Sequence, residues 1–364
     1  MNSARWPAGL LALLLALSPA AASQRLSEIR HGGRIGQIKL ERVNRRLHGY
    51  LVDYTHNHGA DRRIWSPALC AKRDLYVYLP PGYDPQLRYP LVFVLHGFGQ
   101  DEEFFIDDDL VYRLDAAMAC GKLPPMIVAV PDGSISGHAC LVSPGSFFVN
   151  IPAGRFEDFL MQDVWNFVHC QYPIRPERCA HAMVGVSMGG GAAYNKGIKY
   201  RDRIGIVVGI FPPLNTRWID CHGRYMSNFD PACWGWRTDF SQRHQVVGRF
   251  YGIFTVRLHH LTDPLYGRRN PNILELVSSE NVIEMLETWD VRPGQLEMFL
   301  AYGGRDQFNI DAQVESFLYV ARRRGLCLTV AYDPKGKHDA ATAEEFLPCV
   351  FNWLRPRMEP YSPR

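Results

Sequence analysis

The sequence carries little net charge and no charged tract, which argues against partners that are themselves highly charged. Its 364 residues hold 40 Lys and Arg against 37 Asp and Glu, with neither a basic run nor an acidic tail. Nucleic-acid binding is therefore not expected. Internal repeats and low-complexity segments are also missing. What remains is an ordinary globular composition, 47% hydrophobic, of a size for one large domain or two small ones.

Long apolar runs are missing after the first residues of the chain, so a membrane-spanning helix is not expected there. Residues 1–22 instead resemble a secretory signal peptide, with Arg5 as the basic start and a short apolar run from Leu10 to Leu17. Small residues precede Ser23, where cleavage is expected, and an uncleaved anchor is the alternative. The sequence thus predicts a secreted or periplasmic protein without stable membrane insertion, with residues 23–364 forming a single domain.

No Cys-x-x-Cys motif occurs, so a zinc cluster has no support and no metal site is predicted. Nine cysteines follow the expected signal peptide, and an oxidising compartment favours disulfides. An odd number leaves at least one thiol unpaired within the chain. The expected local pairs are Cys170–Cys179, Cys221–Cys233 and Cys327–Cys349, and the alternative is buried free thiols, because spacing does not fix connectivity.

The rest of the chain alternates between short apolar runs and segments of helical periodicity. This alternation predicts an α/β fold with a mainly parallel central sheet flanked by helices. Residues 35–54 are expected to form edge strands. Further strands are predicted at 74–79, 89–97, 126–130, 179–186, 204–211, 296–302 and 326–332, and helices at 107–120, 156–172, 310–324 and 341–354.

The segment Gly185-Val186-Ser187-Met188-Gly189 follows one of these apolar strands and leads into a helix. It matches the G-x-S-x-G nucleophile elbow, in which glycines two residues before and after the serine permit a sharp turn. Ser187 is then exposed at the apex. The backbone N–H of Met188, at the helix N-terminus, points at a developing oxyanion.

A serine nucleophile needs an oriented imidazole, and the loops after the last two predicted strands supply one. Asp306 follows the strand at 296–302, and His338 follows the strand at 326–332. The carboxyl ends of parallel strands share one edge of the sheet, where Ser187 also lies. The order Ser, Asp, His is that of α/β-hydrolases. Asp311 and Asp333 are the competing acids.

A second oxyanion donor is expected in the loop after the strand that ends at Leu95. Phe98, just beyond Gly97, is the candidate through its backbone N–H. His96 is interpreted as a structural residue that holds this loop. The pair His259-His260 lacks a carboxylate or cysteine at ligand spacing and is interpreted as solvated or structural.

Several motifs together resemble the putative-esterase family of α/β-hydrolases, which includes S-formylglutathione hydrolase (esterase D), enterochelin esterase, feruloyl esterases and mycolyltransferases. The resemblance covers about residues 70–355, with poor similarity from about 213 to 292. It implies a Ser–His–Asp triad, an acyl-enzyme intermediate and no cofactor, and it leaves the acyl and alcohol groups open. The similar motifs are residues 75–84, 96–99, 156–160, 185–190, 303–306 and 336–339.

The segment 213–292 is far longer than a simple crossover between two strands requires, and it is rich in aromatic residues. It leaves a buried strand at the edge where Ser187 is expected, which predicts a cap-like insertion over the site. Trp218, Trp234 and Trp236 are the candidates for substrate contact, since aromatic rings suit aryl or sugar groups. The alternative is that these rings fill a small core of the insertion itself. Arg217, Arg224 and Arg237 lie among the rings and are interpreted as solvated; the alternative is that an arginine near the mouth favours an anionic substrate.

The sequence therefore predicts a secreted serine carboxylesterase for a small-molecule or carbohydrate ester, with a feruloyl or carbohydrate ester as the substrate type. An acyltransferase of the mycolyltransferase type uses the same triad and is one alternative. A peptidase and a non-catalytic binding protein on the same fold are the others. The oligomeric state is not indicated.

Overall fold

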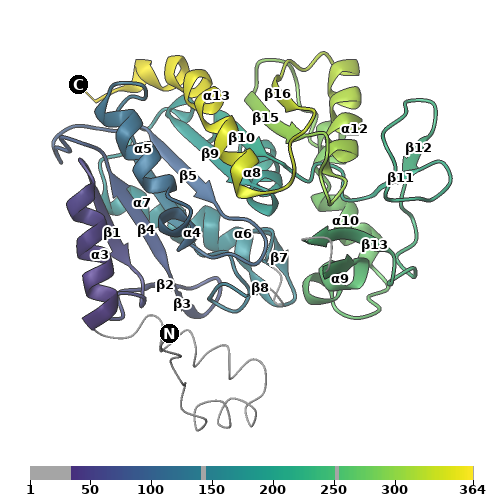
Figure 1. The fold of residues 1–364 in the computed structure, drawn as a ribbon, viewed down its shortest axis with the longest axis horizontal. Helices are drawn as coiled ribbons and strands as arrows, with labels where there is room; N and C mark the ends of the chain where they lie inside the picture. Colours follow the sequence, from purple (N-terminus) through teal and green to yellow (C-terminus); the bar gives the residue numbers. More distant parts are fainter. Residues whose placement is uncertain (1–33, 141–144, 251–253, 364) are drawn as a thin grey trace, which may run out of the picture.

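An eight-stranded sheet forms the centre of the protein in a computed structural model that describes residues 34–140, 145–250 and 254–363 (Figure 1). The strand order is β1-β4-β6-β5-β9-β10-β15-β16; β1 and β4 are antiparallel to their neighbours, and the six strands from β6 to β16 are parallel. The predicted α/β fold with a mainly parallel sheet is thus confirmed. The expected signal peptide lies outside the described residues. The strands are β1 Tyr50–Tyr54, β4 Leu75–Leu79, β5 Leu91–Leu95, β6 Ile127–Pro131, β9 His181–Val186, β10 Ile206–Ile210, β15 Glu297–Gly303 and β16 Thr329–Asp333.

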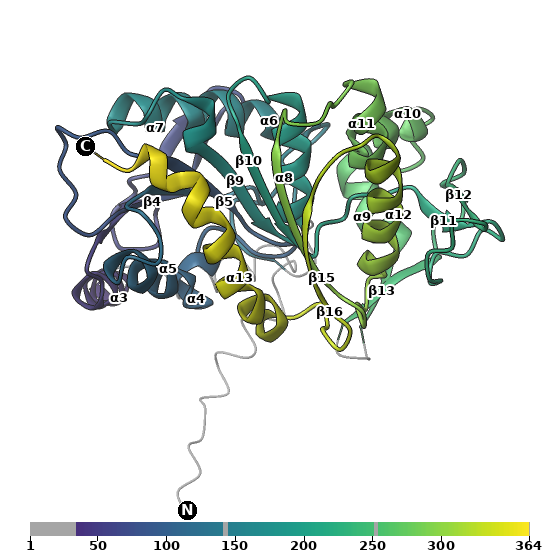
Figure 2. The same cartoon turned by 90° about the horizontal axis from the view of Figure 1, so that it is seen from above.

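The central strands are apolar throughout because helices cover both faces of the sheet. Every residue of β5, β6 and β10 is buried. Figure 2 shows α5 and α13 on one side of the sheet and α7 and α8 on the other. The helices of this main body are α3 Arg34–Arg46, α4 Phe104–Asp107, α5 Leu110–Ala119, α6 Phe156–Asp158, a π-helical stretch Phe159–Val164, α7 Trp165–Gln171, α8 Met188–Lys199, α12 Ile310–Arg323 and α13 Ala340–Met358.

Two elements of the main body differ from the sequence prediction. Residues 35–54 are not all strand: α3 precedes β1, because Leu40, Val43 and Leu47 recur at helical spacing and pack on the core. The last strand, β16, is not buried. It is the edge of the sheet, and Val330 and Tyr332 are exposed.

The long segment between β10 and β15 forms its own small unit at the end of the sheet opposite α3 (Figure 1). A second apolar core gathers there around Trp218, Tyr225, Val247 and Leu258. Its elements are β11 Trp218–Asp220, paired with β12 Trp234–Trp236; β13 Val246–Phe250, paired with β14 Phe254–Arg257; and the helices α9 Leu258–Tyr266, α10 Ile273–Glu280 and α11 Val282–Thr288. Two further hairpins, β2 Ile64–Ser66 with β3 Ala71–Arg73 and β7 Asn150–Ile151 with β8 Gly154–Arg155, flank the main sheet.

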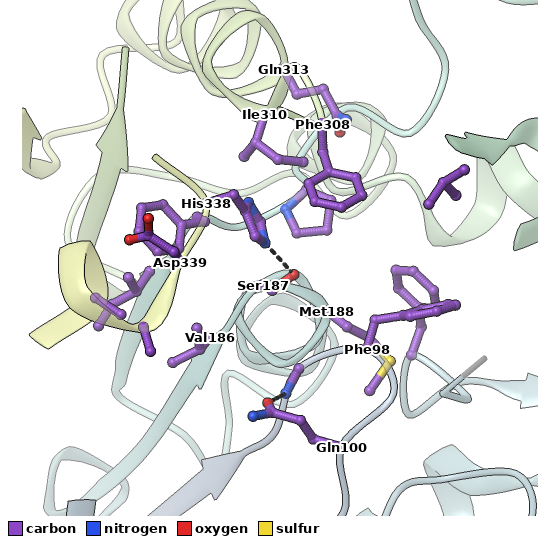
Figure 3. A pocket seen from close by; sticks show the side chains of 18 of the residues that line it. Phe98, Gln100, Val186, Ser187, Met188, Phe308, Ile310, Gln313, His338 and Asp339 are labelled. Carbon is purple, nitrogen blue, oxygen red and sulfur yellow. Dashed lines mark hydrogen bonds between the residues drawn. The ribbon is translucent and has the colours of Figure 1, made fainter. Parts of the chain in front are cut away.

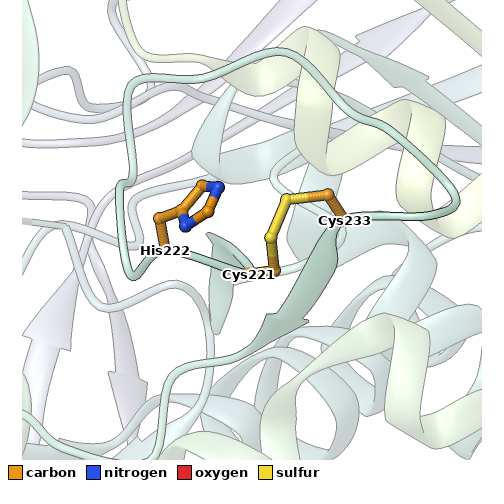
Figure 4. Close-up of side chains that lie close together, drawn as sticks. All are labelled: Cys221, His222 and Cys233. Carbon is orange, nitrogen blue, oxygen red and sulfur yellow. A yellow bond between two sulfur atoms is a disulfide. The ribbon is translucent and has the colours of Figure 1, made fainter.

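One of the three expected disulfides is present. Cys221 and Cys233 are bonded across a loop of the insertion, with Cα atoms 4.8 Å apart (Figure 4). His222 lies next to them, but both sulfurs are used in the disulfide, so no thiolate remains to bind a metal. The predicted pairs Cys170–Cys179 and Cys327–Cys349 were wrong: these four cysteines are free. Proximity in sequence or on neighbouring elements does not by itself meet the strict geometry of a disulfide.

In the part of the chain that the structure describes, none of the helices is both long and apolar enough to cross a membrane.

Candidate active site

The turn between β9 and α8 places Ser187 in a backbone conformation that few residues adopt. Its φ is 53° and its ψ is −120°, which is the strained geometry of a nucleophile elbow. The flanking glycines are required by contact: a Cβ at Gly185 would lie 2.1 Å from the Gly189 carbonyl oxygen. A Cβ at Gly189 would lie 2.1 Å from the Leu95 carbonyl oxygen. The glycine spacing seen in the sequence therefore corresponds to real close approaches.

The structure brings Ser187, His338 and Asp306 into one hydrogen-bonded line (Figure 3 shows the Ser187–His338 part). His338 Nε2 lies 2.8 Å from Ser187 Oγ, and His338 Nδ1 lies 2.7 Å from Asp306 Oδ2. An ionised carboxylate only accepts, so Nδ1 carries the proton and Nε2 is free to accept from the serine hydroxyl. This arrangement can move the hydroxyl proton onto the imidazole.

Neighbouring groups hold both partners of the serine. The Asp306 side chain is fully buried, and its second oxygen, Oδ1, accepts from the Phe308 N–H at 2.8 Å. The main-chain N–H of His338 donates to Gln307 Oε1 at 2.8 Å. The imidazole packs against the rings of Phe211 and Phe308, whose centroids lie 5.0 and 4.9 Å from its own. The apolar rings restrict water around the His338–Asp306 pair, which strengthens its electrostatics.

The two competing acids lie elsewhere. Asp333 Oδ1 accepts from the Lys335 N–H in the turn after β16. Asp311 is in the first turn of α12, where burial and the charge of Asp306 raise its pKa to about 6. The carboxylate that contacts His338 is that of Asp306.

The two expected oxyanion donors flank Ser187. Met188 begins α8, so its N–H has no acceptor inside the helix. Phe98 lies in the loop after β5, and its N–H donates to none of the main-chain carbonyls in the part of the chain that the structure describes. A Cβ at Gly97 would lie 3.6 Å from Ser187 Cβ, so this loop packs directly against the serine. Both N–H groups are therefore available beside Ser187.

His96 holds this loop from inside the protein, as the sequence suggested. Its Nδ1 donates to the Gly97 carbonyl at 2.9 Å, and its Nε2 accepts from the Gly133 N–H at 2.8 Å. Complete burial lowers the pKa of His96, which keeps the ring neutral as these two bonds require. His259 and His260 likewise make local bonds within the insertion, to the Arg243 carbonyl and from the Arg257 N–H.

A mainly apolar pocket of about 400 Å³ opens over Ser187. This volume is in the range that binds small molecules. The main body contributes Phe98, Phe147, Met188, Phe211, Phe308 and Leu347, and the insertion contributes Thr216, Tyr225, Arg237, Val247, Val256, Leu258 and Leu261. The insertion thus forms part of the pocket, as the prediction of a cap-like segment requires.

The three tryptophans that were expected to contact substrate do not line this pocket. Trp218 is fully buried in the insertion core, with its indole N–H bonded to the Tyr225 carbonyl. Trp234 and Trp236 pack on each other at 5.1 Å in β12. The insertion needs a core of its own, and Trp218 fills it. Trp234 is half-buried at the edge of that core, and Trp236 is half-buried against the main core. The packing alternative is the one that the structure favours.

Buried acids that could attract a metal lie near the amino end of β4. Ligand atoms of Asp74, Glu102 and Asp132 lie within 4.8 Å of one another. However, Asp132 pairs with Arg73 at 3.2 Å, and Asp74 bonds His56 Nδ1 at 2.9 Å. The cluster is thus engaged with protein cations, and we interpret it as structural.

Four of the pocket residues, Phe211, Phe308, Tyr225 and Arg237, were not placed in the pocket from the sequence. Phe211 and Phe308 each follow the carboxyl end of a parallel strand, which is the signal that could have identified them. Tyr225 and Arg237 lie in irregular parts of the insertion, where no periodic pattern places a side chain.

Known proteins with related sequences include esterases. The chain is 26% identical over 159 residues to an endo-1,4-beta-xylanase/feruloyl esterase of Xylanibacter ruminicola, covering 42% of this chain and 21% of that protein. It is 31% identical over 157 residues to an esterase of Mycobacterium tuberculosis, covering 41% and 32%. The chain therefore spans a third or less of the length of these relatives.

Solved structures with a similar fold include a ferulic acid esterase, with a TM-score of 0.62, 17% identity and coverage of 86% of this chain and 99% of that one. An S-formylglutathione hydrolase from Agrobacterium tumefaciens gives a TM-score of 0.59, 14% identity and coverage of 86% and 96%. At these identities the likeness concerns the fold, which is that of the α/β-hydrolases. The family model described as putative esterase matches residues 66–339. The chain belongs to the putative esterase family.

Proposed function

We propose that this protein is a serine carboxylesterase that acts through an acyl-enzyme on Ser187. The observation that carries the proposal is the continuous line of hydrogen bonds from Asp306 through His338 to Ser187 at the floor of an apolar pocket. Family membership and the esterase relatives support the same reaction class.

In the proposed mechanism, Ser187 Oγ attacks the ester carbonyl carbon while His338 Nε2 takes its proton. Asp306 keeps the imidazole oriented and stabilises the imidazolium. The N–H groups of Met188 and Phe98 hold the oxyanion of the tetrahedral intermediate. His338 then returns the proton to the leaving alcohol, and water attacks the acyl-enzyme with His338 as base. Acid and free enzyme result.

The substrate in this proposal is an ester with a bulky apolar or aryl acyl group, of the feruloyl or carbohydrate-ester type. Apolar and aromatic walls around Ser187 suit such a group. The names of the relatives point in the same direction. Export through the N-terminal segment is part of the proposal, supported by the disulfide in the insertion. N-terminal sequencing of the mature protein from an expressing cell tests it, with a start at Ser23 expected.

The test of the reaction is a panel of p-nitrophenyl esters of rising acyl length plus methyl ferulate, assayed with wild type and Ser187→Ala. We expect turnover by the wild type and essentially none by the folded variant. Adding an acceptor alcohol separates hydrolysis from acyl transfer, since a transferase forms mainly the new ester. Equal activity of the variant would refute the proposed function.

A further inference from the structure

Arg237 is a buried cation in the pocket wall that lacks an acidic partner. Only 4% of the surface of Arg237 is accessible to solvent. Two further arginines are buried among the described residues, and each has a carboxylate: Arg217 pairs with Glu284 at 2.6 Å, and Arg73 pairs with Asp132 at 3.2 Å. For Arg237, no carboxylate lies within ion-pair distance in residues 34–140, 145–250 and 254–363.

The contacts that Arg237 does make are neutral. Its Nη2 donates to Gln245 Oε1, and its guanidinium carbon lies 5.8 Å from the centre of the Phe240 ring. The main-chain N–H of Arg237 donates a hydrogen bond to the Arg217 carbonyl at 2.7 Å. The acid nearest in sequence, Asp239, is exposed and acts on Arg237 only through its charge, without an ion pair. Its carboxylate accepts from the N–H and hydroxyl of Ser241. Desolvation of a guanidinium is costly without an anion, and burial accordingly lowers the pKa of Arg237, although the side chain stays charged.

A short chain of contacts connects Arg237 to the proposed catalytic groups. Arg237 and Tyr225 lie close enough to interact electrostatically, and both line the pocket. The Tyr225 hydroxyl donates to the Phe308 carbonyl at 2.8 Å, and the Phe308 ring lies against His338. The wall between Arg237 and Ser187 is therefore apolar and aromatic, with a cation at its far end.

The acids that line the same pocket lie on other elements and are already engaged. Asp108 accepts from Gln100 at 3.0 Å, Glu344 pairs with Arg113, and Asp339 caps the first turn of α13. Tyr225 and Gln313 on the Arg237 side bond each other at 2.9 Å. An anion that enters the pocket thus finds its free positive partner only on the insertion side, within the described residues.

We infer that Arg237 is a substrate-binding residue that recognises a carboxylate carried by the ester, separated from the scissile carbonyl by an apolar spacer. The inference rests on the proposed esterase function and names its substrate class. A planar guanidinium with unused N–H groups matches a carboxylate geometrically, and a pocket that excludes water strengthens the pair. The carboxylate belongs either to the acyl half or to the alcohol half of the ester.

Two matched pairs of esters test this inference and distinguish the halves. The acyl-side pair is mono-p-nitrophenyl adipate and its methyl-capped form; the alcohol-side pair is the butyrate ester of 4-hydroxybenzoate and that of methyl 4-hydroxybenzoate. In at least one pair, wild type should prefer the acid by roughly tenfold or more in kcat/KM. Raising KCl from about 20 mM to about 500 mM should reduce this preference.

Arg237→Met should abolish the preference, by lowering kcat/KM for the acid relative to that for its capped partner, and Arg237→Lys should keep part of the preference. Arg224→Met is the matched control, since it removes an exposed charge from the same insertion that is already paired with Asp220. It should leave the preference unchanged. An unaltered preference in folded Arg237→Met overturns the inference, and so does a wild type without preference in both pairs, even if no Arg237 variant folds.

Failure of the proposed function gives a different pattern. In that case the wild type hydrolyses none of the four esters, or Ser187→Ala hydrolyses them equally well. Hydrolysis of all four through Ser187 without preference for either acid removes only the assignment of Arg237.

Discussion

Asp306 is the acid that contacts His338 in the proposed triad. Substitution can distinguish its role from those of Asp311 and Asp333, the two other candidate acids. Asp306→Asn leaves a similar shape but permits the wrong imidazole tautomer, so kcat should fall by roughly 10⁴-fold. The double variant with His338→Ala should lose little more than either single variant, since the three groups act as a unit. Steady-state kinetics on a p-nitrophenyl ester measures both.

Asp333→Asn and Asp311→Asn are the matched controls for this prediction. Asp333 contacts a turn N–H, and Asp311 lies in the first turn of α12 without contacting His338. Both should stay within a fewfold of wild type. A large loss in either control, with Asp306→Asn near wild type, would assign the acid differently.

The positions of single residues could be predicted from the sequence where backbone geometry dictates them. Gly185 and Gly189 predict the nucleophile elbow, because a Cβ at either position would collide with the main chain. Asp306 and His338 were identified because parallel strands end at one edge. Arg237 was interpreted as solvated, which is wrong, because its burial depends on how an irregular insertion folds back onto the sheet.

At the scale of elements, the elbow helix α8 is anchored by a buried charge cluster. The ammonium group of Lys196 is fully buried against Glu157, at the junction with α6, and Lys199 donates to the same carboxylate at 2.7 Å. Burial alone would raise the pKa of Glu157, but the two ammonium groups outweigh it and lower the pKa to about 2. The cluster thus joins α6 to the helix that carries the nucleophile.

Glu157→Gln should therefore destabilise the protein by about 3–5 kcal/mol at neutral pH, because it leaves Lys196 buried without its anion. The folded-state pKa of Glu157 lies below its ordinary 4.5, so its stabilisation is complete above about pH 4.5 and is lost as the pH falls toward 2. Urea unfolding at several pH values should show that the difference in the free energy of unfolding between wild type and Glu157→Gln becomes smaller in acid. Glu41→Gln, which breaks an exposed pair with Arg45, should change stability little at any pH.

Element types followed from periodicity where the pattern was long, as in α12 and the buried strands. The prediction of edge strands over residues 35–54 was wrong for the first part of this segment. Leu40, Val43 and Leu47 recur at the spacing of a helix, while neighbouring residues partly alternate as in a strand. Packing of α3 beside β1 decides between the two. In the insertion, the aromatic residues predicted a cap with tryptophans facing the substrate, but Trp218 fills the core of the insertion, and Trp234 and Trp236 pack outside the pocket.

For the whole molecule, the structure predicts a specific thiol count. Cys221 and Cys233 are bonded, and seven cysteines are free. Alkylation of the denatured protein without reductant should label seven thiols, and all nine after reduction. Non-reducing peptide mapping should recover Cys221 linked to Cys233. A linked Cys170–Cys179 or Cys327–Cys349 peptide would contradict the structure.

The central claim is that Ser187 is the nucleophile of an esterase, and a fluorophosphonate probe tests it most directly. The probe reacts with a serine only when an adjacent base activates it, so the wild type should gain one adduct in intact-mass spectra as esterase activity disappears. Peptide mapping should place the adduct on Ser187, and Ser187→Ala and His338→Ala should remain unlabelled. Labelling of another residue, or ester turnover that survives complete modification of Ser187, would contradict the account.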